Sequence, residues 1–198
     1  AYAARRRSLI DPARAMTDIE IKPGIAPPKR AERRVPGGGT AYFCTVDRDG
    51  MAVSIIQSLY YEFGSAALGG DTGVVLQNRG SFFALDENHP NRLERGKRTF
   101  HTLIPAMLTK NGKPWAVLGS MGGEGQPQTH IALLTRMVDF GMDPQAAISA
   151  PRYLLGRTWG EATSAMIVES RVGDEVLREL GRRGHPIARA GAWEEAMG

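Results

Sequence analysis

The chain has 198 residues, 42% of them hydrophobic and 23% charged, a balance that suits one globular domain with a core of its own. No run of 18 apolar residues occurs, so the sequence predicts no membrane-spanning helix and no membrane partner. The single cysteine, Cys44, excludes an internal disulfide and a cysteine cage for zinc, and its alternating neighbours predict a buried strand position.

The formal net charge of +4 would suit a nucleic-acid partner if it were spread over the folded part. Residues 1–39, however, hold nine Lys and Arg against four Asp and Glu, and the remainder holds 16 against 17. The excess positive charge therefore lies in the leading segment, and no basic patch interleaved with aromatic residues follows it. We expect no nucleic-acid partner.

The leading segment combines a short helix, predicted over residues 2–9, with a linker. Between residues 22 and 39 the helix and strand breakers are too dense for either element to continue. These breakers are Pro23, Gly24, Pro27, Pro28, Pro36, Gly37, Gly38 and Gly39. The leading segment ends in three glycines, and we expect it to pack sparsely against the rest of the chain.

From residue 40 onward the pattern is one of short strands. Residues 41–46 and 51–58 are predicted strands, and the Asp-Arg-Asp-Gly run at 47–50 predicts the tight turn between them. That run lacks the later ligands and the closing Glu of a calcium loop, so the turn is the stronger interpretation. Further strands are predicted at 72–76, 103–109 and 115–118, with Asn111-Gly112 as the turn between the last two.

Helices are predicted in the second half of the chain. Apolar residues at helical spacing indicate helices over 128–140 and 174–183. The pair Asp143-Pro144 predicts the start of a short helix through Ala150, because Asp is a favoured N-cap and Pro a favoured first helical residue. A strand is also predicted over 165–168, and the last residues, 194–198, show no closing element.

The order of these elements indicates an α/β fold with layers of strands and helices. We expect the hairpin at 41–58 to be central in a sheet that helices 128–140 and 174–183 cover.

Gly39 and Thr40 stand where the glycine-rich linker meets the first strand of this hairpin. A Thr hydroxyl is a poor nucleophile without a base beside it, and a free N-terminal amine is the most economical base. An enzyme of this kind must cut its own chain before the Thr. From the pattern alone, Thr40 could equally be an ordinary first residue of a strand.

The loop Gly119-Ser120-Met121-Gly122-Gly123 follows the predicted strand 115–118 directly. Glycines at such a place allow backbone N–H groups to approach a ligand closely, as an oxyanion hole requires. The same run would also serve as an ordinary tight connection between a strand and a helix.

The sixteen residues GTAYFCTVDRDGMAVS, at 39–54, resemble the start of the small subunit of gamma-glutamyltranspeptidases. Four shorter runs match the same family in order and approximate spacing: Phe63-Gly64-Ser65, Leu76-Gln77-Asn78, Gly119 to Gly123, and Ala150-Pro151-Arg152. The resemblance covers residues 40–198 and extends into the tail of the large subunit before them.

This resemblance implies an αββα sandwich of the N-terminal-nucleophile hydrolase type, incomplete in this chain. Residues 1–39 would be the tail of the large-subunit region and the linker to the cleavage site, and 40–198 a small-subunit domain truncated at its C-terminus. It also implies autocatalytic cleavage between Gly39 and Thr40, with Thr40 as the later nucleophile and no cofactor or metal. Gly122 and Gly123 match the oxyanion-hole positions, and Ser58 matches a hydroxyl that hydrogen-bonds the nucleophile.

The expected substrate contacts depart from the family pattern. After Asn78 the chain has Arg79, and Phe82 stands in place of the acid that holds the substrate α-amino group. The family's usual Ser pair reads His101-Thr102. Asn78, Arg79, His101 and Thr102 are therefore the predicted substrate-binding residues, and a cation without a partnering acid favours a carboxylate over an ammonium.

This pattern resembles the family's outlying amidohydrolase branch, with a small carboxylate-bearing amide as substrate; gamma-glutamyl hydrolysis or transfer is the alternative. The expected partner is the large-subunit half of the same precursor, without which the chain could be an inert fragment. An unrelated N-terminal-nucleophile hydrolase is a further alternative, and Arg79 could also be a solvated residue that pairs with Asp86 or Glu87. The compartment stays open between cytoplasm and periplasm of a bacterial-type enzyme.

Overall fold

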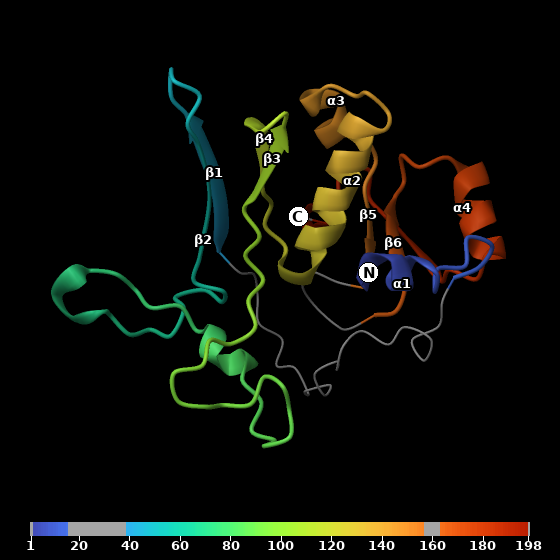
Figure 1. Ribbon diagram of the computed structural model, residues 1–198. Helices are drawn as coiled ribbons and strands as arrows, with labels where there is room; N and C mark the ends of the chain where they lie inside the picture. The colour runs from blue at the N-terminus through green and yellow to red at the C-terminus, as the bar shows by residue number, and fades with distance from the viewer. Residues whose placement is uncertain (1, 16–38, 157–162, 198) are drawn as a thin grey trace.

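The computed structural model describes residues 2–15, 39–156 and 163–197 (Figure 1). It is a mixed α/β structure in which four α-helices, seven strands and four short 3₁₀ helices are described. The helices are α1 (Tyr2–Arg7), α2 (Gln126–Val138), α3 (Pro144–Ser149) and α4 (Asp174–Arg182). The strands are β1 (Thr40–Val46), β2 (Ala52–Ser58), β3 (Ala106–Lys110), β4 (Lys113–Leu118), β5 (Tyr153–Leu155), β6 (Met166–Glu169) and β7 (Ile187–Ala190).

The hairpin of β1 and β2 confirms the strands and turn predicted at 41–58. Asp47 closes the turn, because its carboxylate accepts the backbone N–H groups of Asp49 (2.9 Å) and Met51 (2.8 Å). Gly50 supplies the positive φ, +85°, that the turn needs. The strands are antiparallel, and their register sets Thr40 opposite Ser58. The first and last residues of the hairpin therefore face each other.

A second hairpin, β3 and β4, lies beside the first (Figure 1). Its turn at Asn111-Gly112 has positive φ at both residues, +54° and +76°, as a two-residue hairpin turn requires. The Oγ of Ser54 on β2 donates to the carbonyl of Ala106 on β3 (3.0 Å). This bond ties the two hairpins together.

The third sheet gathers the C-terminal strands. β6 pairs with β5 antiparallel and with β7 parallel, and α4 connects β6 to β7. Met166 and Val168 of β6 pack with Leu177 of α4 as a buried core, and partly buried apolar residues surround them. Asp143 caps α3, as predicted, by accepting the N–H of Ala146 (2.8 Å).

Several predictions about elements were wrong. Residues 72–76 form no strand: a 3₁₀ helix, Gly70–Thr72, precedes Gly73 at φ +71°, and Val75 makes only an isolated bridge to Leu68. A further short element that was not predicted, the 3₁₀ helix Glu195–Met197, lies at the end of the described residues, and its Met197 is buried.

The first hairpin is a separate two-stranded sheet rather than the centre of a larger one. Helix α4 packs on β6 and β7 instead of covering it. Cys44, expected to be buried, is exposed. On the opposite face of the hairpin Phe43, Val53 and Ile55 are exposed as well, and no described element covers that face.

The leading segment is described only up to residue 15, so the linker predicted at 22–39 lies outside the described residues except for Gly39. The described part of the chain contains no helix long and apolar enough to span a bilayer. Within the same ranges, no group of three or more His, Cys, Asp or Glu side chains is placed to hold a metal ion.

Candidate active site

Thr40 and Ser58 are in direct contact at the open end of the first hairpin. The register of β1 and β2 places them opposite each other, and the Thr40 hydroxyl donates to Ser58 Oγ at 2.9 Å. The predicted proximity of these two hydroxyls is therefore present, while their catalytic roles stay predictions.

Arg79 contacts this pair through Ser58. Its side chain is only 2% exposed, and its two terminal nitrogens donate to Thr102 Oγ1 (2.5 Å) and to Ser58 Oγ (3.2 Å). The ring of Tyr60 lies 4.9 Å from the guanidinium carbon. The alternative of a solvated Arg79 paired with Asp86 or Glu87 is therefore wrong.

No carboxylate pairs with Arg79 among the described residues, and its Nε has no hydrogen-bond partner there. Burial lowers the pKa of Arg79 from its usual value, because a desolvated guanidinium loses the hydration that stabilises its charge. The site thus contains a buried cation without a counter-ion in the described structure.

The other predicted substrate contacts surround Arg79. Asn78 accepts the N–H of Tyr61 through its side chain (3.2 Å) and so ties this loop to the end of β2. His101 accepts the N–H of Leu103 (3.1 Å), and its pKa is lowered by partial burial and then by the charge of Arg79. Thr102 is buried beneath the guanidinium.

Phe82 belongs to an aromatic cluster around the cation. Its ring centre lies 4.6 Å from that of Tyr60 and 5.6 Å from that of Phe100, and 6.0 Å from the guanidinium carbon of Arg79. Sequence reasoning identified Phe82 only as a missing acid and overlooked Tyr60. The one signal for Tyr60 is its place two residues after Ser58.

The glycine loop after β4 adopts backbone conformations that favour glycine. Gly122 and Gly123 both adopt positive φ, +105° and +48°, and α2 begins three residues after Gly123. The loop thus leads directly into the N-terminus of α2, which is an end of a helix that favours negative charge. The role of Gly122 and Gly123 as an oxyanion hole for Thr40 stays a prediction.

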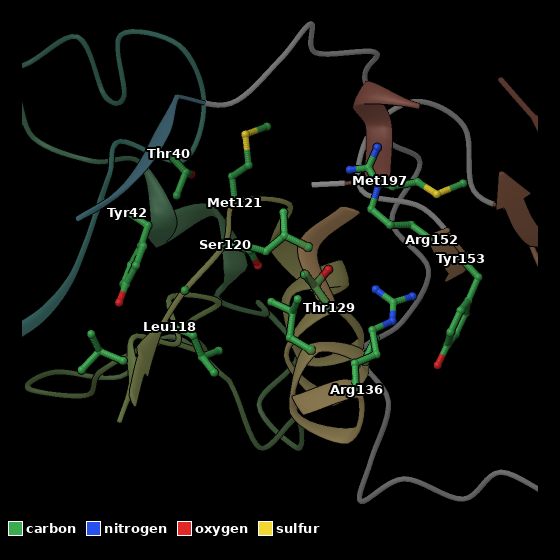
Figure 2. A pocket seen from close by; sticks show the side chains of 15 residues that line it. Thr40, Tyr42, Leu118, Ser120, Met121, Thr129, Arg136, Arg152, Tyr153 and Met197 are labelled. Carbon is green, nitrogen blue, oxygen red and sulfur yellow. The ribbon is translucent and has the colours of Figure 1, made fainter. Parts of the chain in front are cut away.

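A cavity of about 530 Å³ opens beside Thr40. Figure 2 shows Thr40, Tyr42, Ser120 and Met121 on one side of it and side chains of α2 and β5 on the other. The first half of the glycine loop, Gly119 to Met121, therefore borders the same cavity as Thr40, whereas Gly122 and Gly123 are not among its lining residues. The walls are mostly apolar; their cations are Arg136 and Arg152.

Arg152, of the Ala-Pro-Arg run, is held by a fully buried carboxylate. Glu169 accepts hydrogen bonds from the guanidinium of Arg152 (2.7 Å), from that of Arg171 and from the backbone N–H of Glu194 (3.1 Å). Burial alone would raise the pKa of Glu169, but these hydrogen bonds outweigh it and lower the pKa below its usual range. The network joins β6 to the C-terminal segment.

The sequence model of the gamma-glutamyltranspeptidase family matches residues 1–197. The chain belongs to the gamma-glutamyltranspeptidase family. A glutathione hydrolase-like proenzyme, YwrD, of Bacillus subtilis is 57% identical over 168 residues, which is 85% of this chain and 32% of that protein. The oxamate amidohydrolase proenzyme of Klebsiella pneumoniae is 41% identical over 210 residues, which is 100% of this chain and 40% of that protein.

The fold agrees with this membership. The crystal structure of cephalosporin acylase from Bacillus halodurans matches 99% of the chain with a TM-score of 0.75 and 40% identity, and the match is 32% of that structure. The chain therefore has part of an N-terminal-nucleophile hydrolase fold of the gamma-glutamyltranspeptidase type, as the sequence indicated. It spans about a third of the length of these relatives.

Proposed function

We propose that the full-length protein is a proenzyme that cuts itself between Gly39 and Thr40 and then acts as an amidohydrolase. Thr40 would hydrolyse or transfer the acyl group of small amides whose acyl part bears a carboxylate. The observation that supports this specificity best is Arg79, a buried guanidinium without a described counter-ion, one hydroxyl away from Thr40.

A buried charge is costly unless an opposite charge accompanies it. Ser58 bridges the nucleophile and the cation, with contacts of 2.9 Å to Thr40 and 3.2 Å to Arg79. In this proposal a short acyl chain places a carboxylate near Arg79 while its amide carbon lies at Thr40; Arg79 itself is not among the residues that line the cavity beside Thr40. The α-ammonium group of a gamma-glutamyl substrate would face the uncharged ring of Phe82, at the position where the family pattern has an acid. Its charge would therefore stay unpaired.

The chemistry proceeds through Thr40 in both stages. In maturation the Thr40 oxygen bonds to the Gly39 carbonyl carbon, the Gly39–Thr40 C–N bond breaks, and the Thr40 proton passes to the departing nitrogen. Water then hydrolyses the resulting ester, leaving a Gly39 carboxylate and a free Thr40 amine. That amine serves as base for the same hydroxyl when it attacks a substrate amide, and water or an amine resolves the acyl-enzyme.

One relative supports a carboxylate-bearing acyl group, because it is named for oxamate, the monoamide of a dicarboxylic acid. The similarity to a cephalosporin acylase supports acyl-amide hydrolysis more generally. A gamma-glutamyl substrate is the second candidate, favoured by the 57% identity to a glutathione hydrolase-like protein.

The proposal includes the preceding half of the precursor as a structural partner. The first hairpin exposes Phe43, Val53 and Ile55, and α2 exposes Ile131 and Val138. Apolar surfaces of this kind are typical of a face that another part of the protein covers. Without that half the chain alone is expected to be inactive.

Intact-mass measurement of the full-length protein tests the cleavage. We expect a fragment that begins at Thr40 in the wild type, and an uncut precursor without turnover in Thr40→Ala. Cleavage at another bond, or turnover by Thr40→Ala, would contradict the role of Thr40.

Paired assays with a glutaryl anilide and a gamma-glutamyl anilide test the substrate class. Rates are compared per cleaved molecule, counted by mass, so that a maturation defect does not enter the ratio. We expect the wild type to prefer the glutaryl amide roughly tenfold or more, and Arg79→Ala to lose that preference, because a paired charge in a dry site is worth a factor of this order. A preference for the gamma-glutamyl substrate that Arg79→Ala leaves unchanged would refute the specificity.

A further inference from the structure

We propose that Arg79 is also a positioning residue for the nucleophile: its guanidinium holds the Ser58 oxygen against Thr40 and so sets the rate at which the chain cuts itself. This role precedes any substrate. It rests on the proposed function only in taking Thr40 as the self-cleaving residue.

Ser58 Oγ accepts hydrogen bonds from three donors. They are the Thr40 hydroxyl (2.9 Å), a terminal nitrogen of Arg79 (3.2 Å) and the backbone N–H of Tyr60 (3.0 Å). A hydroxyl oxygen offers two acceptor lone pairs, so the three bonds cannot all have full strength at once. The donors therefore compete for Ser58.

The charged donor has the advantage in this competition, because hydrogen bonds from a guanidinium are stronger than those between neutral groups. Tyr60 N–H is fixed by the backbone. The Thr40 hydroxyl makes the shortest of the three contacts, 2.9 Å, and the guanidinium the longest, 3.2 Å, so the charge of Arg79 offsets its greater distance. The Thr40 oxygen is therefore held against a Ser58 oxygen whose position the guanidinium of Arg79 and the N–H of Tyr60 both fix.

Contacts with Thr102 and Tyr60 fix the position of the Arg79 guanidinium itself. Its second terminal nitrogen donates to the buried Thr102, and the ring of Tyr60 covers its face. Tyr60 has a φ of +75°, a backbone conformation that is unusual for an aromatic residue. This one residue places both its N–H at Ser58 and its ring over Arg79. The Ser58 oxygen is thus positioned by groups that have little freedom to move.

The positioning of Ser58 depends on the planar shape of the Arg79 guanidinium as well as on its charge. The two terminal nitrogens of Arg79 serve two different hydroxyls, Thr102 and Ser58. A lysine ammonium at this position would supply a point charge but no planar fork that fits both oxygens. The guanidinium gains and loses no proton in the cleavage; it only positions Ser58.

The test follows self-cleavage of the full-length precursor by intact mass over time, without substrate. Arg79→Met should slow cleavage roughly tenfold to hundredfold, the effect of losing a charge-assisted hydrogen bond. Arg79→Lys and Thr102→Val should fall between Arg79→Met and the wild type. Arg48→Met, at the exposed turn of the same hairpin, is the matched control and should cleave like the wild type.

A double-mutant cycle decides whether Arg79 acts through Ser58. In a Ser58→Ala background the further change Arg79→Met should slow cleavage less than twofold. Equal slowing in both backgrounds, or wild-type cleavage by Arg79→Met, would overturn the inference. If Arg79→Met fails to fold, Thr102→Val decides, since it leaves the charge in place: wild-type cleavage by that variant would refute the positioning role. A wild-type precursor that never cuts at Gly39 would instead refute the proposed function.

Discussion

At the scale of single residues, the site depends on a close approach that only glycine allows. A Cβ on Gly119 would lie 2.2 Å from a ring atom of Tyr42, which joins the loop after β4 to β1. Gly119→Ala should therefore lower the free energy of unfolding by about 1–3 kcal/mol, the usual cost of overpacking. Urea unfolding of the full-length protein measures this. Gly191→Ala is the control, because a Cβ there has no neighbour within 4 Å. Equal stability of the two variants would contradict the packing of Tyr42 on the glycine loop.

At the scale of elements, the hairpin of β1 and β2 carries both Thr40 and Ser58, and Asp47 stabilises its turn with two backbone hydrogen bonds. Asp47→Ala should lower the free energy of unfolding by roughly 1 kcal/mol, since these bonds are exposed. The Gly39–Thr40 cleavage of molecules that remain folded should be unchanged, because the register is also set along both strands. Arg48→Ala at the same turn is the control and should have no effect on stability. An Asp47→Ala protein as stable as Arg48→Ala would show that the turn contributes nothing to the hairpin.

At the scale of the whole molecule, Glu169 connects β6, the Arg152 loop and the C-terminal segment. Its pKa is lowered in the folded state, so its stabilising effect is complete above its usual pKa of about 4.3 and is lost as the pH falls through the lowered value.

Glu169→Gln should lower the free energy of unfolding by about 3 kcal/mol at neutral pH. This is the lower end for a broken buried pair, because both arginines are partly exposed. The difference from the wild type should shrink below about pH 4, measured by urea unfolding at several pH values. A difference that is constant down to pH 3 would contradict the lowered pKa of Glu169. Glu179→Gln, an exposed carboxylate on α4, is the comparison at the surface.

The sequence by itself determined the local structure. Turn residues such as Asp47, Gly50 and Asn111 act through their own backbone preferences, so the two hairpins were predictable from short windows. The Asp143 cap was predictable for the same reason. The family, and the placement of Thr40 next to Ser58, followed from motifs whose spacing the hairpin register then realised.

Only the tertiary structure decided the state of Arg79 and the exposure of Cys44. A solvated loop arginine and a buried cation have the same local sequence, and the distinction arises because Thr102, Tyr60 and Phe82 come together from separate segments. Cys44 alternates like a buried strand residue, yet it is exposed, because burial depends on contacts with segments that are distant in the sequence. Contacts between distant segments carry no signal in a short window, and these contacts bury the Arg79 charge next to Ser58 and Thr40 without a described counter-ion.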